Sequence, residues 1–549
     1  MESSLELEYP VVVSIDFGTT YSGVAYALTA NDNRDVYDVT LWPKQIQHSY
    51  SKTPTEIMYD RNTHKVTYWG NAARTSVRKT NDKHHHFRQF KLYYDEVMSE
   101  HLKPLPEGFD HMKLSADFLR KLHDHAAYEI SKAFGSFPPE RYRYCLTVPA
   151  IWSDKAKSEM REVAKLAGLI NEDDHPDRLM LISEPEAAAL YCENHCQTFN
   201  MNDGDEFIIC DAGGGTVDLI AFRARIDEKG NRRFEESTKG LGGVCGSVFI
   251  DRRMRLYLKE KLKHLMTPKS KKEFEHVMEE FVQNQKHAMD GIDGVTIKTH
   301  VLRLTSESDP SIGLEDNHLY ISPEEYKKII DPVVDQVIEL IYQQKEQTTN
   351  LKAILMVGGF SRSNYLYSRV CDEFESKNIN VYVPQRAEMA VTRGAVYYAM
   401  TPRKITTRVL RKWYGIDYTT PFDPLLDPPE LKIIRADGEV RCDNRFCTYA
   451  RRGESLEYDQ CVSRWFKTYY PDKTACTIYA ADTEDEPRYI TQPGVKKIFE
   501  LIVPMPFIED AKPGDRVEFE IRIYFGDVEL RVEAQIRGKV YETICNFNV

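Results

Sequence analysis

Short apolar runs alternate with longer amphipathic stretches along roughly the first 400 residues. The runs that predict strands are Val11–Phe17, Tyr144–Val148, Leu179–Ile182, Phe207–Cys210, Ile354–Val357 and Val381–Val383. The clearest helical stripe has apolar residues four positions apart, at Phe118, Leu122, Ala126, Ile130 and Phe134. Strands that alternate with helices predict an α/β fold around mainly buried sheets.

The pattern changes after about residue 405, where apolar and polar positions alternate with a period of two. The apolar positions are Val517, Phe519, Ile521 and Ile523, then Val528, Leu530, Val532, Ala534 and Ile536. A turn at Gly526 and Asp527 separates the two sets, which predicts a half-buried antiparallel hairpin. We therefore expect a large α/β domain over residues 1–402, a basic connector over 403–412 and a smaller β-rich domain over 413–549.

The composition is typical of a globular protein, with 42% hydrophobic and 29% charged residues among 549. A net charge of −12 argues against nucleic acid or anionic lipid as a general partner. The sequence contains no apolar run long enough for a membrane span, and its first residues, MESSLELEYP, do not resemble a secretion signal. Several of the eleven cysteines lie in apolar runs (Cys145, Cys210, Cys545), which favours buried reduced thiols. We expect a cytoplasmic protein.

Two of the predicted strands end alike, with an aspartate, then glycine, then threonine. The first reads VVVSIDFGTTY around Asp16 and the second FIICDAGGGTV around Asp211, which indicates an internal duplication. Glycine turns let successive N–H groups point into one anion-binding concavity, so two such loops face to face would hold a polyphosphate. A buried carboxylate needs a partner, and Mg²⁺ bridging carboxylates to phosphates would supply it for both aspartates.

Two further glycine turns occur, GLGG at Gly240–Gly243 and VGGFSR at Val357–Arg362. Together with IDFGTTYSGVAY, TVPAIWSDKAK, ISEPEAAALY and CDAGGGTVDL, they stand in the order and spacing of one known family. Over roughly residues 10–400 the chain resembles the nucleotide-binding domain of the seventy-kilodalton heat-shock chaperones, in the actin, sugar kinase and chaperone superfamily. The segment Phe499–Ala534 resembles the end of the family's substrate-binding domain. The chain is most similar to the divergent twelve A-like branch.

The resemblance implies an actin-like, duplicated (ribonuclease-H-like) ATPase domain followed by a β-sandwich domain, with ATP or ADP and Mg²⁺ as ligands. It implies that Asp16 and Asp211 hold Mg²⁺ through water. It implies two phosphate loops, formed by Gly18, Thr19, Thr20 and Tyr21 and by Gly213, Gly214, Gly215 and Thr216. The catalytic residues that it implies are Lys91, Glu184, Asp211 and Thr216.

In the family, Glu184 would orient the attacking water or the metal's hydration shell, and Lys91 would stabilise charge on the γ-phosphoryl group. The residues implied to line the nucleoside are Gly242, Gly243, Lys286, Gly358, Gly359 and Arg362, with Glu388 near the ribose and the hinge. The chemistry agrees, because phosphoryl transfer needs mainly positioning and charge neutralisation.

Each of these residues also has a structural interpretation. Glu184 and Pro185 suit the first turn of a helix, where both residue types are favoured. Lys91 would be a solvated lysine, and the family's spacing from an acid to Lys286 is not reproduced here. We expect a solvated loop at His84–His86 rather than a metal site. For Cys192–Cys196 we expect a helix face with buried thiols rather than zinc ligands.

The connector RKITTRVLRKWYGIDY is basic where the family is acidic, and we expect a β domain without the family's helical lid. The sequence therefore leaves three functions open. The first is a slowly hydrolysing, chaperone-like ATPase whose β domain binds a polypeptide client or a dedicated protein partner. The second is a nucleotide-dependent scaffold or sensor with little hydrolysis, and the third a small-molecule kinase of the same superfamily. We expect a monomer, with nucleotide-exchange or other helper proteins as further partners.

Overall fold

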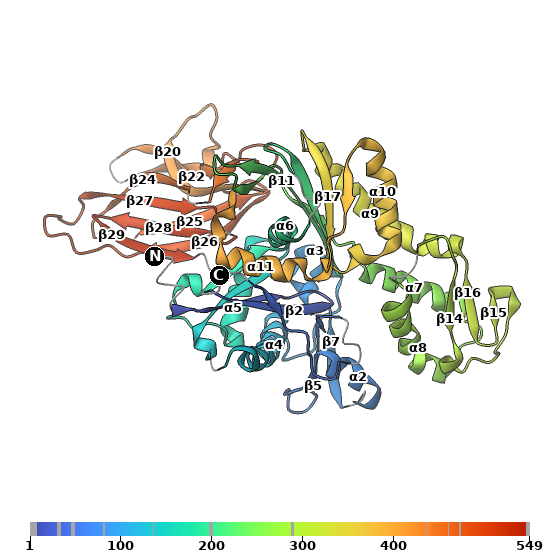
Figure 1. The fold of residues 1–549 in the computed structure, drawn as a ribbon. Helices are drawn as coiled ribbons and strands as arrows, with labels where there is room; N and C mark the ends of the chain where they lie inside the picture. Colours follow the sequence, from blue (N-terminus) through green and yellow to red (C-terminus); the bar gives the residue numbers. More distant parts are fainter. Residues whose placement is uncertain are drawn as a thin grey trace. The chain divides into compact units, whose positions relative to one another are not determined.

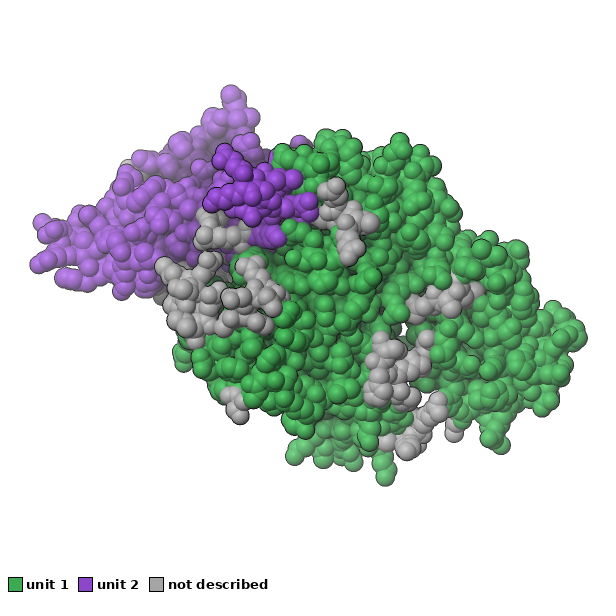
Figure 2. Space-filling model, viewed as in Figure 1, with its two compact units in different colours: residues 1–151, 164–224, 240–402 green, residues 152–163, 225–239, 403–549 purple. Residues whose placement is uncertain are grey.

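The computed structural model describes residues 8–29, 35–45, 50–80, 83–135, 137–196, 201–286, 290–435, 438–458, 460–471, 474–526 and 528–544. It is a mixed α/β structure with several sheets (Figure 1). The chain divides into two compact units (Figure 2). The first contains residues 1–151, 164–224 and 240–402, and the second contains 152–163, 225–239 and 403–549. The three-part division drawn from the sequence stays a prediction.

The first sheet of the first unit has the strand order β3-β2-β1-β8-β9. Its strands are β1 (Val11–Asp16), β2 (Tyr21–Leu28), β3 (Tyr37–Asp38), β8 (Tyr142–Val148) and β9 (Leu179–Ser183). β1 is buried along its whole length, as its apolar run predicts. It pairs antiparallel with β2 and parallel with β8, which in turn pairs parallel with β9.

The second sheet repeats this arrangement. Its strands in the first unit are β10 (Glu206–Ala212), β11 (Val217–Ile226), β13 (Leu241–Gly243), β17 (Leu351–Val357) and β18 (Asn380–Tyr382). β10 pairs antiparallel with β11 and parallel with β17, and β17 pairs parallel with β18. In both sheets an antiparallel hairpin is therefore followed by two parallel strands, and the loop of each hairpin carries one of the glycine motifs.

Helices surround these sheets (Figure 1). They are α4 (His111–Phe134), α6 (Glu184–His195), α7 (Val248–Lys261), α8 (Pro268–Glu280), α9 (Pro323–Glu346), α10 (Asn364–Phe374) and α11 (Ala390–Met400). One of them, α8, lies away from both sheets beside α7 (Figure 1). The predicted stripe on α4 is buried at Phe118, Leu122, Ala126 and Ile130. α9 begins with a capping box, in which Ser322 and Glu325 each accept a backbone N–H of the other, and with Pro323 at its first position.

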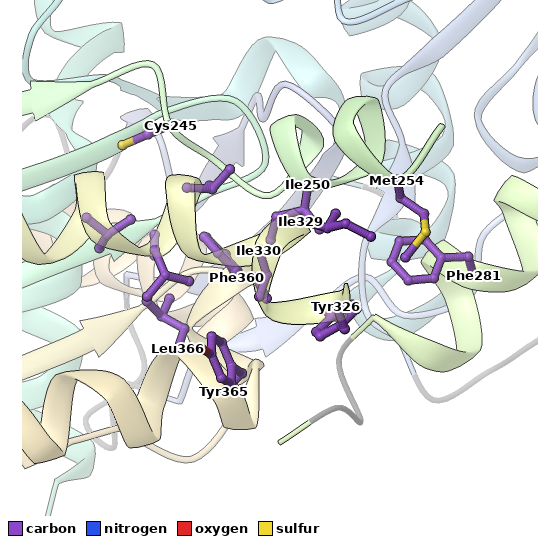
Figure 3. Packing of buried hydrophobic residues seen from close by; sticks show 14 of the residues in the cluster. Cys245, Ile250, Met254, Phe281, Tyr326, Ile329, Ile330, Phe360, Tyr365 and Leu366 are labelled. Atoms are coloured by element: carbon purple, nitrogen blue, oxygen red, sulfur yellow. The ribbon is translucent and has the colours of Figure 1, made fainter. Parts of the chain in front are cut away.

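One continuous core joins the second sheet to the helices around it. Figure 3 shows Ile250 and Met254 of α7 together with Tyr326, Ile329 and Ile330 of α9 in this cluster. The same cluster includes apolar residues of a small sheet, β14 (Val295–Lys298), β15 (Leu314–Glu315) and β16 (His318–Ile321). This packing fixes α7 at the back of the second glycine loop.

A smaller sheet follows the first hairpin. It contains β5 (Glu56–Asp60), β6 (Val66–Trp69) and β7 (His84–Arg88), with β4 (Thr53–Pro54), α2 (Gly70–Thr80) and α3 (Glu96–His101) nearby in sequence. The solvated loop that we predicted at His84–His86 is wrong, because these residues form β7 against β5. His86 Nε2 lies 2.9 Å from Glu56 Oε2, so the buried carboxylate accounts for this part of the histidine run.

The second unit is rich in strands, as the period-two pattern predicts. One sheet has the order β21-β22-β20-β25-β26 and another the order β24-β27-β28-β29. Their bounds are β20 (Trp413–Pro421), β21 (Lys432–Ile434), β22 (Val440–Ala450), β24 (Cys461–Tyr469), β25 (Thr474–Ala481), β26 (Val495–Val503), β27 (Arg516–Tyr524), β28 (Arg531–Ile536) and β29 (Lys539–Ile544). The predicted hairpin is confirmed as β27 and β28, with Phe519 opposite Ile536 and Ile523 opposite Val532. Asp527, in its turn, lies outside the described residues.

The segment expected to be a connector contains a strand, β19 (Ile405–Val409). Within the second unit β19 pairs parallel with β12 (Arg232–Glu236) and antiparallel with β23 (Ser455–Glu457). The first ten residues of α5 (Asp154–Ala167) also belong to this unit, where Arg161 contacts Glu529 through Nη2 and Oε2 at 2.7 Å. The second unit is thus assembled from three separate pieces of sequence.

Among the helices that the structure describes, none is long and apolar enough to cross a lipid bilayer. Cys145 and Cys210 are buried free thiols, and Cys545 lies outside the described residues. Cys192 is buried on α6, and Cys196 is the half-buried C-cap of that helix.

Candidate functional site

The two glycine loops predicted to bind phosphate lie against each other. A Cβ atom added to Gly214 would stand 2.2 Å from Thr20 Oγ1, and one added to Gly215 would stand 2.6 Å from Thr19 Oγ1. Such distances leave no room for a side chain at either glycine. Folding therefore brings together two motifs that are almost two hundred residues apart in the sequence.

The second loop is backed by the start of α7. The N–H groups of Gly246, Ser247 and Val248 donate to the carbonyls of Gly215, Gly213 and Gly214 at 3.1, 3.1 and 2.9 Å. In a trans peptide the carbonyl and the next N–H point in opposite directions. The N–H groups of residues 214–216 therefore point away from this backing segment, in the arrangement that an anion-binding loop requires. Gly246 was not predicted as a site residue, although its missing side chain permits this approach, since an added Cβ would stand 2.5 Å from the carbonyl carbon of Gly214.

Asp16 ends β1 in a buried position and accepts three hydrogen bonds. Lys52 Nζ lies 2.5 Å from its Oδ2, and the hydroxyls of Thr147 and Thr392 donate at 3.2 and 3.3 Å. Burial alone would raise the pKa of Asp16, but the ammonium group of Lys52 outweighs it and holds this pKa below its usual range. The sequence predicted Mg²⁺ as the partner of Asp16, whereas in the structure its carboxylate is paired with Lys52, a residue not predicted for the site.

Lys91 and Glu184 form a second buried pair. Lys91 Nζ lies 2.7 Å from Glu184 Oε1, and their side chains are 5% and 9% exposed. Glu184 opens α6, where Ser183 is the N-cap and Pro185 follows, so the helix-start interpretation also holds. Burial raises the pKa of Glu184 to about 7 despite the charge of Lys91, with the charges of Asp218 and Asp16 acting in the same direction as burial.

Asp211 ends β10 in the most acidic part of this cluster. Burial raises its pKa well above the usual value, and the charges of Glu184, Asp16 and Asp218 raise it further. Asp218 is opposite Asp211 in the β10–β11 register and accepts the N–H of Ile151 at 3.2 Å. Asp218 was not predicted as a site residue, although an acid inside the apolar run TVDLI carries the same signal that identified Asp16.

The glycine turn at Gly358 and Gly359 borders Asp211. A Cβ atom on Gly358 would stand 2.3 Å from Asp211 Oδ1, and the left-handed backbone there (φ +85°) also favours glycine. Gly359 lies beside the hydroxyl of Tyr50, 3.6 Å from the position a Cβ would take. Arg362 is exposed and Glu388 is buried, and both act electrostatically on Tyr50, whose pKa is raised to about 12 chiefly by burial. Gly359, Arg362 and Glu388 therefore all lie near Tyr50.

Gly242 and Gly243 lie in β13, beside β11. Added Cβ atoms would stand 2.4 Å from Ile151 Cγ2 and 3.1 Å from Leu340 Cδ1, so packing accounts for both glycines. Lys286 is buried, with Nζ 2.9 Å from Asp251 Oδ1 and 3.3 Å from Ser247 Oγ. The acid that accompanies Lys286 thus comes from α7 rather than from its own segment, and the lysine is held at the back of the second loop.

The charges of the cluster fit a cation. Asp16, Glu184, Asp211 and Asp218 supply four carboxylates, and Lys52 and Lys91 supply two ammonium groups. In the described part of the chain, no three His, Cys, Asp or Glu side chains are close enough to ligate one metal ion directly. A magnesium ion that keeps several waters and contacts one or two carboxylates matches this arrangement.

The chain is similar to curated heat-shock proteins. It is 25% identical to heat shock 70 kDa protein 12B of Homo sapiens over 96% of this chain and 89% of that protein, and 24% identical to heat shock 70 kDa protein 12A of Mus musculus over 95% and 89%. It is also 25% identical to a chaperone protein HscA homolog of Haemophilus influenzae, over 57% of this chain and 44% of that protein.

A family described as a domain of unknown function (DUF8340) matches residues 200–383, which include the glycine turns at 213–215, 240–243 and 358–359. The resemblance inferred from the motifs is confirmed: along nearly its whole length, the chain is similar to the divergent 12A and 12B branch of the seventy-kilodalton heat-shock proteins.

Proposed function

We propose that this protein binds ATP, hydrolyses it slowly and acts as a chaperone-like protein, with its nucleotide state controlling polypeptide or partner binding by the second unit. The observation that carries the proposal is the close contact of the loops at Thr19–Thr20 and Gly214–Gly215 beside a buried acidic cluster. The similarity to heat shock 70 kDa proteins 12A and 12B supports it.

In this proposal the two loops hold the phosphates through backbone N–H groups and threonine hydroxyls. The loop residues are Gly18, Thr19, Thr20, Tyr21, Gly213, Gly214, Gly215 and Thr216. Asp16 and Asp211 would hold Mg²⁺ through water, and this ion would neutralise phosphate charge. Lys91 would stabilise negative charge on the γ-phosphoryl group, and Glu184, paired with it at 2.7 Å, would orient the attacking water.

The nucleoside would lie beside the glycine turn at Gly358 and Gly359. The residues proposed for it are Gly242, Gly243, Lys286, Gly358, Gly359, Arg362 and Glu388. The support is strongest for Gly358 and Glu388, because Gly358 borders Asp211 and donates its N–H to the carbonyl of Ala387, the neighbour of Glu388, at 3.0 Å. Tyr50 joins the proposed set. Its hydroxyl lies beside Gly359, and the centroid of its ring is 5.0 Å from that of the Tyr21 ring.

The second unit would bind the polypeptide or protein partner. Several large apolar side chains of this unit are exposed: Leu425, Trp465, Ile502 and Phe507 are 91%, 63%, 60% and 85% accessible. Contiguous exposed apolar patches mark protein-binding surfaces, and we propose these four side chains as candidates for such a patch. We place the protein in the cytoplasm as a monomer, with helper proteins that exchange its nucleotide.

A second candidate is a nucleotide-dependent scaffold or sensor with little hydrolysis. The ion pair between Lys52 and Asp16 favours it, because an ammonium group on this carboxylate competes with the metal that hydrolysis would use.

Calorimetric titration with ATP and ADP, followed by turnover assays with and without an unfolded peptide, separates these functions. The chaperone-like function predicts ATP binding and turnover that changes when peptide is added. Binding without turnover would favour the scaffold. Absence of nucleotide binding would refute both.

A further inference from the structure

Lys52 is fixed to the first glycine loop by the backbone. It immediately precedes β4, which pairs antiparallel with β2 so that Pro54 is opposite Tyr21 and Thr53 opposite Ser22. The N–H of Thr55 also donates to the carbonyl of Thr20 at 2.9 Å. The lysine therefore occupies a set position beside the loop.

The neighbouring backbone leaves room for the lysine stem. A Cβ atom on Gly23 would stand 3.0 Å from Lys52 Cγ and 3.3 Å from its Cε. The lysine side chain is only 10% exposed, and its Nζ lies 2.5 Å from Asp16 Oδ2. A long, flexible lysine that is held this far from solvent loses much of its rotamer freedom. The residues around Lys52 therefore fix the position of its side chain.

The charge of Lys52 also reaches the second acidic loop. It acts on Asp211 as well as on Asp16, whereas Lys91 is paired with Glu184. Both ammonium groups act on Asp16, but only Lys52 forms an ion pair with it, and Lys91 forms its ion pair with Glu184. A divalent ion bound at Asp16 would lie close to an ammonium group on the same carboxylate, and the two would repel. A polyphosphate placed there would instead be attracted to Lys52.

We propose that Lys52 is a built-in cation of the phosphate site, which neutralises Asp16 and contacts the phosphates of a nucleoside polyphosphate, so that nucleotide binding does not require Mg²⁺. The inference rests on the proposed nucleotide-binding function of the same loops. It makes Asp211 the principal carboxylate for any bound metal and gives Asp16 a lysine partner.

The test is isothermal calorimetry of ATP binding to the full chain, in excess Mg²⁺ and in EDTA. We expect the dissociation constant of the wild-type protein to differ by less than about fivefold between the two buffers. For Lys52→Met we expect a loss of at least about tenfold in EDTA, with a smaller loss in Mg²⁺, where the metal can approach Asp16. Lys65→Met, at an exposed lysine before β6, is the matched control and should behave as wild type.

Because Lys52→Met leaves Asp16 buried without a counter-charge, the double variant Asp16→Asn/Lys52→Met provides a second measurement. Its melting temperature should recover towards wild type, while ATP binding in EDTA stays weak. Wild-type binding that requires Mg²⁺, or an unchanged ratio of the two dissociation constants in Lys52→Met, would overturn the role of Lys52 and leave the proposed function intact. Failure of the wild-type protein to bind ATP in either buffer would overturn both.

Discussion

Thr20 and Gly214 face each other across the two glycine loops, with Thr20 Oγ1 only 2.2 Å from the point where a Cβ of residue 214 would lie. The two halves of the first unit therefore meet at a contact that tolerates no added atom. This contact fixes how far apart the two loops stand. In the proposed function it also sets how closely both loops approach the phosphates of the nucleotide.

Gly214→Ala should push the loops apart. Because the new methyl group would meet Thr20 Oγ1 and Cγ2 within 2.8 Å, we expect ATP affinity to fall by at least about tenfold, or 1.4 kcal/mol, in calorimetry. Because Thr20→Ala removes both of these atoms, the double variant Thr20→Ala/Gly214→Ala should bind ATP about as well as Thr20→Ala alone. An affinity of Gly214→Ala equal to wild type would show that the loop contact does not shape the site.

Lys91→Met should unfold more easily than wild type, because it leaves the buried carboxylate of Glu184 without its ammonium partner. We expect a loss of about 3 kcal/mol in the free energy of unfolding. ATP turnover should also be lost while the nucleotide still binds. In Lys91→Met/Glu184→Gln most of the stability should return, but not the turnover. Lys83→Met, at an exposed lysine nearby, is the control in urea denaturation and in the turnover assay.

Asp211→Asn should stabilise the nucleotide-free protein in EDTA while abolishing turnover. The folded state raises the pKa of Asp211, so the ionised carboxylate opposes folding and the stability of the wild type falls as pH rises above the unfolded value near 3.8. The stability difference between variant and wild type should therefore increase as pH rises above the unfolded value.

Thermal unfolding of Asp211→Asn between pH 5 and pH 8 measures this difference, with exposed Asp173→Asn as the control. A variant less stable than wild type at pH 8 would contradict the mutual repulsion of the acidic cluster. Unchanged turnover would remove Asp211 from the proposed catalytic residues.

Glu56 should make the protein sensitive to acid. Burial opposes its ionisation, but Arg74 and His86, at 2.7 and 2.9 Å, outweigh burial and lower its pKa to about 2. A carboxylate with a depressed pKa contributes stability above its unfolded value near 4.5, and this contribution disappears as pH falls towards 2. The shift corresponds to about 3 kcal/mol at pH 7.

Glu56→Gln should therefore lower the free energy of unfolding at pH 7 and have a much smaller effect at pH 2.5, as measured by urea denaturation. Glu107→Gln, at an exposed glutamate, should have no effect at either pH. A loss of equal size at both pH values would show that Glu56 contributes by packing and not by charge.

The sequence predicted well those features that depend on local pattern. β1 and β10 follow from apolar runs, and the buried faces of β27 and β28 follow from strict alternation. The ion pair of Lys52 with Asp16 could not be predicted from the sequence. A lysine in the segment SKTP is expected to be solvated, and Asp16 is 36 residues away. His84–His86 were misassigned for a related reason, since the acid that contacts His86 lies on β5.

The pairing of β19 with both β12 and β23 limits which fragments of this protein can be produced separately. A polypeptide that starts at Arg403 would contain β19 and β23 but would lack β12, whose Glu236 accepts the N–H of Val409 at 2.8 Å. Such a piece would present an open strand edge of the kind that drives aggregation, and Glu529 would lose Arg161. Gene truncation at the apparent linker thus cuts through a sheet, and dissecting this protein requires circular permutation or grafting of the missing strand.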